Sequence, residues 1–259
     1  MSSTESPLKA WWGPHALPPP GEGLHWRIGP LSLWVRAWPG GWSVHRADSG
    51  DPVDEALIVA EPGLAPPEAD RIRLASERLG GTVVLGARCP DRVIAVRPEI
   101  ALTVLPGDRV TLFVGTAVWL TLGTEAGEVV HELPVYRPTD SWLGPDTRSG
   151  ILAYAGRTSA RTVLADLPPR PGRAVTRLTL VNSTRRPLAF ERVVLPMPSL
   201  ALYADPDHRL WTDDVTYELS ADPEGTVRTA PPGSHPRMSP PRETSEGSAF
   251  RRAWEALFR

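Results

Sequence analysis

The sequence predicts an all-β protein, and three observations support this prediction. Apolar and polar residues alternate with a period of two in segments such as 31–38, as they do in half-buried strands. Glycine and proline, at 22 and 30 of 259 residues, fall mainly between these segments, where turns are expected. Proline at this density also interrupts long helices. We therefore expect two antiparallel β-sandwich-like domains and one short C-terminal amphipathic helix.

The first expected domain spans residues 24–137 and follows an extended lead-in over residues 1–23. Its first alternating segments are 24–28 and 31–38, and the turn signal Pro39-Gly40-Gly41 leads into a third segment over 42–46. A Pro-rich acidic loop is expected over residues 48–70.

Residues 68–85 permit two interpretations. The one that we favour is a hairpin in which 72–74 and 82–85 pair about the turn Gly80-Gly81. The alternative is a short helix over 68–79 that ends at Gly80 and places Ile72, Ala75 and Leu79 on one face.

The remainder of this domain reads as closely spaced strands. They are expected at 93–96, 100–105, 109–114, 117–122 and 129–137. Pro134 limits the last of them to a sheet edge or a break, because proline cannot donate a ladder hydrogen bond. The uncharged stretch 110–124 is shorter than the roughly 18 residues of a membrane helix, and it suits two buried strands better.

The second expected domain spans residues 138–229. Its boundary is placed at 138–150, which is dense in turn-forming residues. Strands follow at 151–155, 173–181, 188–195, 200–203, 210–211 and 215–219, with a tight turn at Asn182-Ser183-Thr184. A Pro/Ser-rich linker covers 230–247. The amphipathic helix covers 248–259, where Phe250, Trp254, Leu257 and Phe258 follow the spacing of one helical face.

Charge is organised although it almost cancels. The net charge of −2 argues against general nucleic-acid binding. Residues 48–70 hold seven acidic residues and no basic one, whereas 148–192 hold nine arginines and two acidic residues. The basic segment is a surface for an anionic partner, a docking site for the acidic loop, or simply a solvated face.

Standard catalytic signatures are missing from the chain. No nucleophile elbow, phosphate-binding loop or dinucleotide fingerprint is found. The six histidines are dispersed, and the single Cys89 excludes an internal disulfide. Cys89 is either activated by its neighbour Arg88 or an inert core residue. We expect no cofactor, and the sequence favours a protein that is not an enzyme without deciding the question.

Four carboxylates form a candidate metal site. Asp205, Asp207, Asp213 and Asp214 lie close together in the sequence, and oxygen ligands gathered on a loop hold hard cations such as Ca²⁺. The competing interpretation is that Asp205 to His208 form a turn between two strands. With a metal, this region suggests a metal-assisted hydrolase.

Two groups of residues are candidates for binding a protein partner. They are Arg157, Arg161 and Arg173 in the basic segment, and Phe250, Trp254 and Phe258 on the C-terminal helix, which equally well docks on its own protein. Trp26, Trp34, Trp38 and Trp42 lie in alternating strands, where tryptophan fills a core or stacks on sugars.

The leading hypothesis is therefore a non-enzymatic protein-interaction or accessory module. The alternative is a ligand-binding β protein for a carbohydrate or an anion, and the metal-assisted hydrolase comes third. The sequence shows no secretory signal and no transmembrane segment, so we expect a cytoplasmic protein, whether free or peripheral to a membrane.

Three blocks carry a resemblance to a known family. They are RPEIALTVLPGDRVTLFVGTAVWLTL (97–122), SWLGPDTRSGILAYAGRTSAR (141–161) and 170–218, followed by SPPRE at 239–243. In order and spacing they resemble a prokaryotic family, domain of unknown function 432. The resemblance implies no catalytic residues. It implies an accessory role near a membrane protein such as a small mechanosensitive channel.

Overall fold

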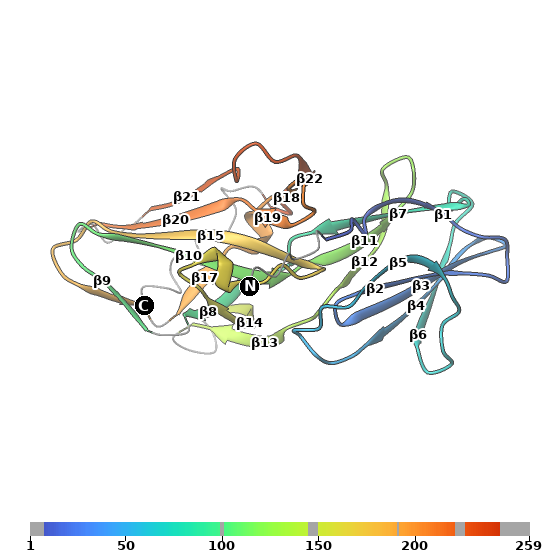
Figure 1. Cartoon of the computed structure of the whole chain (residues 1–259), viewed down its shortest axis with the longest axis horizontal. Helices are drawn as coiled ribbons and strands as arrows, with labels where there is room; N and C mark the ends of the chain where they lie inside the picture. Colours follow the sequence, from blue (N-terminus) through green and yellow to red (C-terminus); the bar gives the residue numbers. More distant parts are fainter. Residues whose placement is uncertain (1–7, 99–100, 145–149, 191, 221–225, 244–259) are drawn as a thin grey trace, which may run out of the picture.

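The computed structural model describes residues 8–98, 101–144, 150–190, 192–220 and 226–243, and it is long in one direction (Figure 1). Regular structure in these ranges is almost entirely β, with two single-turn 3₁₀ helices at Leu164–Asp166 and Met197–Ser199. The expected all-β class is confirmed. The expected C-terminal helix over 248–259, with Phe250, Trp254 and Phe258, lies outside the described residues.

A five-stranded antiparallel sheet occupies one end of the molecule (Figure 1). Its strands are β2 (Leu24–Ile28), β3 (Leu31–Trp38), β4 (Gly41–Asp48), β5 (Leu57–Pro62) and β6 (Asp70–Ala75), in the order β5-β2-β3-β4-β6. The period of two in the sequence determines which residues lie on the inner face of this sheet, because alternate residues of a strand point to the same side. Leu33, Val35, Trp26 and Trp42 are fully buried on that inner face.

A four-stranded sheet lies at the same end. It consists of β1 (Gly13–Ala16), β7 (Thr82–Arg88), β11 (Trp119–Gly123) and β12 (Val129–Pro134), in the order β1-β7-β11-β12. Strand β12 is at the sheet edge and carries Pro134, which confirms the position expected from its missing N–H.

The favoured hairpin over 72–85 is wrong, and so is the alternative helix. Both segments are strands, but β6 pairs with β4 while β7 pairs with β1 and β11. Residues 76–81 carry the chain from one sheet to the other, and the Trp42 indole donates a hydrogen bond to the Gly80 carbonyl at 2.8 Å.

The remaining strands form the other end. They are β8 (Ile94–Pro98), β9 (Leu102–Val104), β10 (Arg109–Ala117), β13 (Thr139–Leu143), β14 (Ile151–Ala160), β15 (Arg173–Asn182), β16 (Leu188–Phe190), β17 (Val193–Leu195), β18 (Leu202–Ala204), β19 (Leu210–Thr212), β20 (Asp214–Leu219), β21 (Thr226–Ala230) and β22 (Arg237–Ser239). One sheet follows the order β21-β20-β15-β19-β18-β22, with β10 also on β15; the others are β13-β14-β8-β17 and β16-β9. Three pairings are parallel: β14 with β8, and β15 with β19 and β20.

The stretch 110–124 forms two strands, as expected, but they lie in different sheets. Strand β10 pairs with β15 along nine residues, and β11 pairs with β7 and β12. Strands β8 to β10 thus fall within the expected first domain while pairing with strands of the second, and one cluster of buried residues extends over both ends. Whether 24–137 and 138–229 are separate folding units stays a prediction.

The segment 138–150, which is dense in turn-forming residues and was the expected domain boundary, includes strand β13, which pairs with β14 from Thr139 to Leu143. A high density of turn-forming residues therefore did not exclude a strand here, because β14 provides the backbone hydrogen-bond partners of β13. In the described part of the chain, no helix has the length and apolar character needed to cross a membrane.

Candidate ligand-binding site

The outer face of the five-stranded sheet carries aromatic and basic side chains in register. Trp34 on β3 lies opposite His45 on β4, which in turn lies opposite Arg71 on β6. One step further along the strands, Arg36 shares the next row with Arg73. The ladder therefore brings together residues that are as many as 37 positions apart in the sequence.

The connection from β5 to β6 crosses this face. These two strands are opposite edges of the sheet, so four interstrand spacings, roughly 19 Å, separate them. Seven residues, 63–69, span at most about 24 Å when fully extended, so they cross almost directly. Gly63 begins the crossing with a hydrogen bond to the Gly23 carbonyl at 2.9 Å. A Cβ on Gly63 would lie 3.1 Å from the Cβ of His25, so a larger residue would push the connection away from the sheet.

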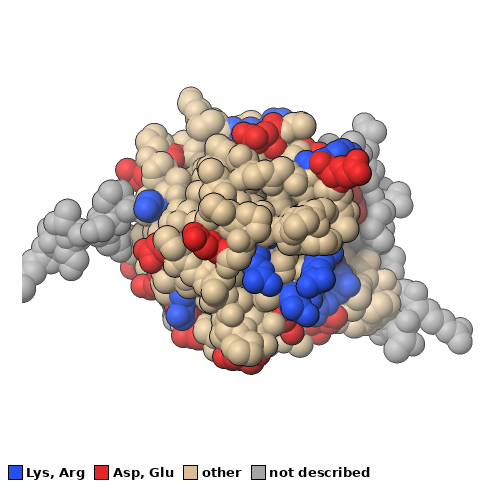
Figure 2. Space-filling view, turned by 90° about the vertical axis from the view of Figure 1, so that its right-hand side faces the viewer, with Lys and Arg blue, Asp and Glu red and all other residues tan. Residues whose placement is uncertain are grey.

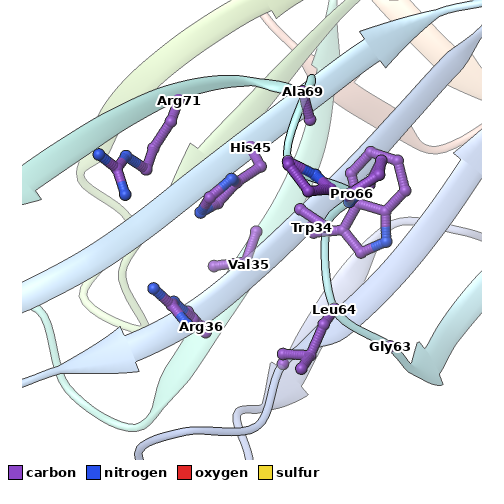
Figure 3. Close-up of a pocket in the computed structure, with 12 residues that line it drawn as sticks. Trp34, Val35, Arg36, His45, Gly63, Leu64, Pro66, Ala69 and Arg71 are labelled. Atoms are coloured by element: carbon purple, nitrogen blue, oxygen red, sulfur yellow. The ribbon is translucent and has the colours of Figure 1, made fainter.

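A pocket of about 410 Å³ lies between the sheet face and this connection (Figure 3). Its floor is formed by the side chains of Trp34, Arg36, His45 and Arg71, and residues 63–67 and Ala69 contribute the opposite side. Figure 3 shows Trp34 next to Pro66, and Arg36 and Arg71 on either side of His45. This volume is within the range of small-molecule sites.

The pocket is basic. Arg36 and Arg71 line it, and among the described residues neither forms an ion pair with a carboxylate. No aspartate or glutamate is found among its described lining residues. Figure 2 views the end of the molecule that carries this sheet and shows basic side chains gathered in one region, with acidic side chains around it.

His45 is the one side chain among the described lining residues whose ordinary pKa lies close to neutral pH. Burial and the two positive charges of Arg36 and Arg71 lower its pKa below the ordinary value. Its Nε2 shares a hydrogen bond of 3.0 Å with the Ser43 hydroxyl, which fixes the ring. Trp34 is fixed in a similar way, because its indole stacks on His25 with ring centroids 4.6 Å apart and planes 8° from parallel.

The chemistry of the pocket suits binding better than catalysis. None of its described lining residues carries a hydroxyl, a thiol or a carboxylate. The hydroxyl next to His45 is that of Ser43, which is only 1% exposed and does not line the pocket, so it is not presented to a ligand as a nucleophile. The lining instead offers an aromatic surface and positively charged hydrogen-bond donors, which bind and orient an anion.

The four tryptophans of this sheet divide between two roles. Trp26 and Trp42 are fully buried, which is the core role, whereas Trp34 lines the pocket and Trp38 lies under the Arg73 guanidinium at 5.5 Å. The alternation along residues 31–38 already contains this distinction. Trp34 and Trp38 are at even-numbered positions, whereas the buried Leu33 and Val35 are at odd-numbered positions and so lie on the other face of the strand. Arg36, His45 and Arg71 were not among the predicted site residues, since their meeting depends on strand pairing.

Three of the four predicted metal ligands, Asp205, Asp213 and Asp214, accept hydrogen bonds from protein donors, whereas the exposed Asp207 contributes its backbone N–H to Asp205. Asp205 accepts hydrogen bonds from the backbone N–H groups of Asp207 and Arg209, and from the Trp211 indole at 2.9 Å. These are the bonds of a turn between β18 and β19, which was the competing interpretation.

The other two carboxylates of that group point to different partners. Asp213 is buried and accepts hydrogen bonds from the Ala201 N–H and the Tyr203 hydroxyl at 2.7 and 2.8 Å. Asp214 pairs with Arg177. Within the described ranges, no three His, Cys, Asp or Glu residues are placed to hold a metal ion.

The expected acidic loop over 48–70 is not a loop throughout, because it contains strand β5. The part before β5, which keeps the name acidic loop, contacts the basic segment within the same chain. Glu55 pairs with Arg170 at 3.0 Å, and Arg173 donates to the Pro52 carbonyl at 2.8 Å. These contacts agree with the second interpretation of the charge pattern, docking of the loop. Of the other predicted partner residues, Arg161 exchanges backbone hydrogen bonds with Phe113, and the side chain of Arg157 is outside the described atoms.

Cys89 is a core residue. It is 2% exposed, and burial, followed by the charge of Asp213, raises the pKa of its thiol to about 12. A thiol in this environment is not activated, whatever the effect of Arg88.

Fold and pocket together define an all-β protein with a basic, aromatic pocket on one sheet face. The sequence profile of the family described as Protein of unknown function (DUF432) matches residues 11–259, and the chain belongs to that family. The resemblance seen in the sequence is thereby confirmed. Comparison with curated proteins found no match, and comparison with solved structures found none either.

Proposed function

We propose that this protein is a non-enzymatic binding module whose Trp34 pocket holds an acidic carbohydrate. One observation carries the proposal: Arg36, His45 and Arg71 line the same pocket as the indole of Trp34, and no carboxylate is found among the described residues that line it. An acidic sugar matches both parts, because its ring stacks on an aromatic face and its carboxylate accepts hydrogen bonds from guanidinium groups.

The absence of a neutralising carboxylate is what favours an anion over a neutral sugar. Surface arginines commonly have acidic neighbours, as Arg46 has Asp70 at 3.5 Å on the same sheet. Arg36 and Arg71 lack such a neighbour in the described structure, so their mutual repulsion is relieved when an anion enters.

Isothermal titration calorimetry with galacturonic acid oligomers tests the proposal, with galactose oligomers of the same length as the neutral comparison. The Arg71→Gln variant is expected to weaken binding of the acidic oligomer about 10- to 100-fold, because it removes a charged hydrogen bond. Arg73→Gln is the matched control, since Arg73 is on the same exposed strand and does not line the pocket.

Equal affinity for acidic and neutral oligomers would contradict the proposed role of charge. Loss of binding in Arg73→Gln equal to that in Arg71→Gln would show a general effect of net charge and no pocket. If an acidic peptide binds and the oligomers do not, the site is basic as proposed but the ligand class is wrong.

The leading sequence-based hypothesis, a protein partner bound through the basic segment or the C-terminal helix, stays a prediction. So do the suggested channel partner, the cytoplasmic location and the peripheral membrane association. Affinity purification with and without residues 247–259 is the direct measurement, and recovery of no partner in both samples contradicts the hypothesis.

A further inference from the structure

A second cavity, of about 210 Å³, lies where the acidic loop meets the other end of the molecule. Pro52 and Val53 of the loop line it, together with residues of β10 and of the segment that precedes β15. Three arginines, Arg161, Arg170 and Arg173, contribute to the lining, and Asp166 is the one acidic residue among the described lining residues.

Arg173 is the central group of this cavity. Its side chain lies over Gly115, where an added Cβ would be 3.7 Å from its Nε. The two terminal nitrogens donate to the carbonyl oxygens of Pro52 and Gly115 at 2.8 and 2.9 Å. These bonds use two of the five guanidinium N–H groups, and both acceptors are neutral.

No carboxylate in the described structure neutralises Arg173. Burial, with the charge of Arg170 next, lowers the pKa of its guanidinium to about 10. Taking a cation out of water without a counter-charge is unfavourable, and two carbonyl groups offset this only in part.

Arg170 is the second donor. Its Nε bonds to Glu55 at 3.0 Å, while its two terminal amino groups have no hydrogen-bond partner among the described residues. Arg161 is held in place by its paired backbone hydrogen bonds with Phe113 at 2.7 and 3.0 Å, and the Tyr136 phenol also lines the cavity.

We propose that this cavity, distinct from the Trp34 pocket, binds a small oxyanion of phosphate size between Arg170 and Arg173. The free guanidinium N–H groups supply the charged hydrogen bonds, and the anion supplies the counter-charge that Arg173 lacks. Because the acidic loop forms one wall, binding also strengthens the attachment of that loop to β10 and β15.

The first test is thermal unfolding and isothermal titration calorimetry with inorganic phosphate. Sodium chloride at the same ionic strength is the reference, since a nonspecific salt effect is common to both. Phosphate is expected to raise the melting temperature above the chloride reference, because a ligand of the folded state shifts the equilibrium towards it. The same measurement with glycerol 3-phosphate distinguishes a free ion from the phosphate end of a larger molecule.

Variants assign the site. Arg173→Met is expected to weaken phosphate binding at least tenfold. Asp166→Asn removes the exposed negative charge at the cavity, so it is expected to tighten binding about two- to fivefold. Asp108→Asn makes the same charge change at an exposed turn that does not line the cavity, and it is expected to leave the affinity unchanged.

The proposal survives even if Arg173→Met fails to fold, because the comparison of Asp166→Asn with Asp108→Asn then decides. It is overturned if neither phosphate compound binds above the chloride reference, or if the two aspartate variants behave alike. Arg71→Gln must leave phosphate binding intact, since a loss there would place the anion in the Trp34 pocket instead.

Discussion

Some of the buried polar side chains in this protein have specific partners, and Asn182 is the clearest example. Asn182 is fully buried at the end of β15, where its amide donates to the carbonyl groups of Val104 and Arg186 at 2.8 and 2.9 Å. Its oxygen accepts from the Thr184 N–H at 3.0 Å. The tight turn expected at Asn182-Ser183-Thr184 is thus confirmed, and its side chain also ties β15 to β9.

The histidines make the stability depend on pH. Burial lowers the pKa values of His15, His25, His45 and His131 in the folded protein. The unfolded chain then binds protons that the folded chain does not, so their contribution is complete above the unfolded pKa of about 6.5. It is lost as the pH falls below that value towards the lower folded pKa values. Urea unfolding between pH 7.5 and 5.5 is expected to show a decreasing free energy of unfolding.

A replacement at one of these histidines provides the control. His131→Gln is expected to reduce the pH dependence, because it removes one of the four titrations. A free energy of unfolding that rises as the pH falls over this range would contradict the sign of the effect.

Strand pairing, more than local pattern, determines the elements. Alternation in the sequence located β2, β3 and β4 and the two strands of 110–124, because one face of each strand is buried. It did not show which strands pair: β6 and β7 separate into different sheets, and three pairings are parallel. Pairing depends on contacts between segments that are distant in the sequence, and a local pattern contains no information about such contacts.

The close approach of β4 and β6 is set by a glycine. A Cβ on Gly41 would lie 1.9 Å from the Leu74 carbonyl oxygen, and Gly41 has a φ of +151°. Gly41→Ala is therefore expected to lower the free energy of unfolding by about 2–4 kcal/mol through displaced backbone. Chemical denaturation measures the change.

Gly81→Ala is the matched control, because an added Cβ there meets nothing within 4 Å and Gly81 has no positive φ. It is expected to change the stability by at most about 0.5 kcal/mol. Equal losses in both variants would show that the approach of Leu74 is not what requires glycine.

At the scale of the whole molecule, long-range charged contacts connect separate parts of the chain. Arg242, after β22, donates from Nε to the Cys89 carbonyl at 2.7 Å and pairs with Glu132 on β12. The side chains of Arg242 and Glu132 are only 17% and 22% exposed. Together with Arg170 and Glu55, this pair joins segments that lie far apart in the sequence.

Removal of Arg242 tests that connection. Arg242→Met leaves Glu132 partly buried without its closest partner, and we expect a loss of about 1.5–3 kcal/mol in the free energy of unfolding. Arg78→Met is the control, because the Arg78–Glu128 pair is 72% and 43% exposed and is worth at most about 1 kcal/mol. A loss no larger than that of the control would show that the buried pair contributes little.

The sequence by itself determined the all-β class, the family and the positions of most strands. It did so because burial of one strand face imposes a period of two, and because glycine and proline collect at turns. It also contained the charge segregation, whose acidic loop and basic segment meet through Glu55 and Arg170. Only the tertiary structure decided which strands are neighbours, and therefore which side chains gather. Trp34, Arg36, His45 and Arg71 form a pocket because β3, β4 and β6 align in register beneath residues 63–69.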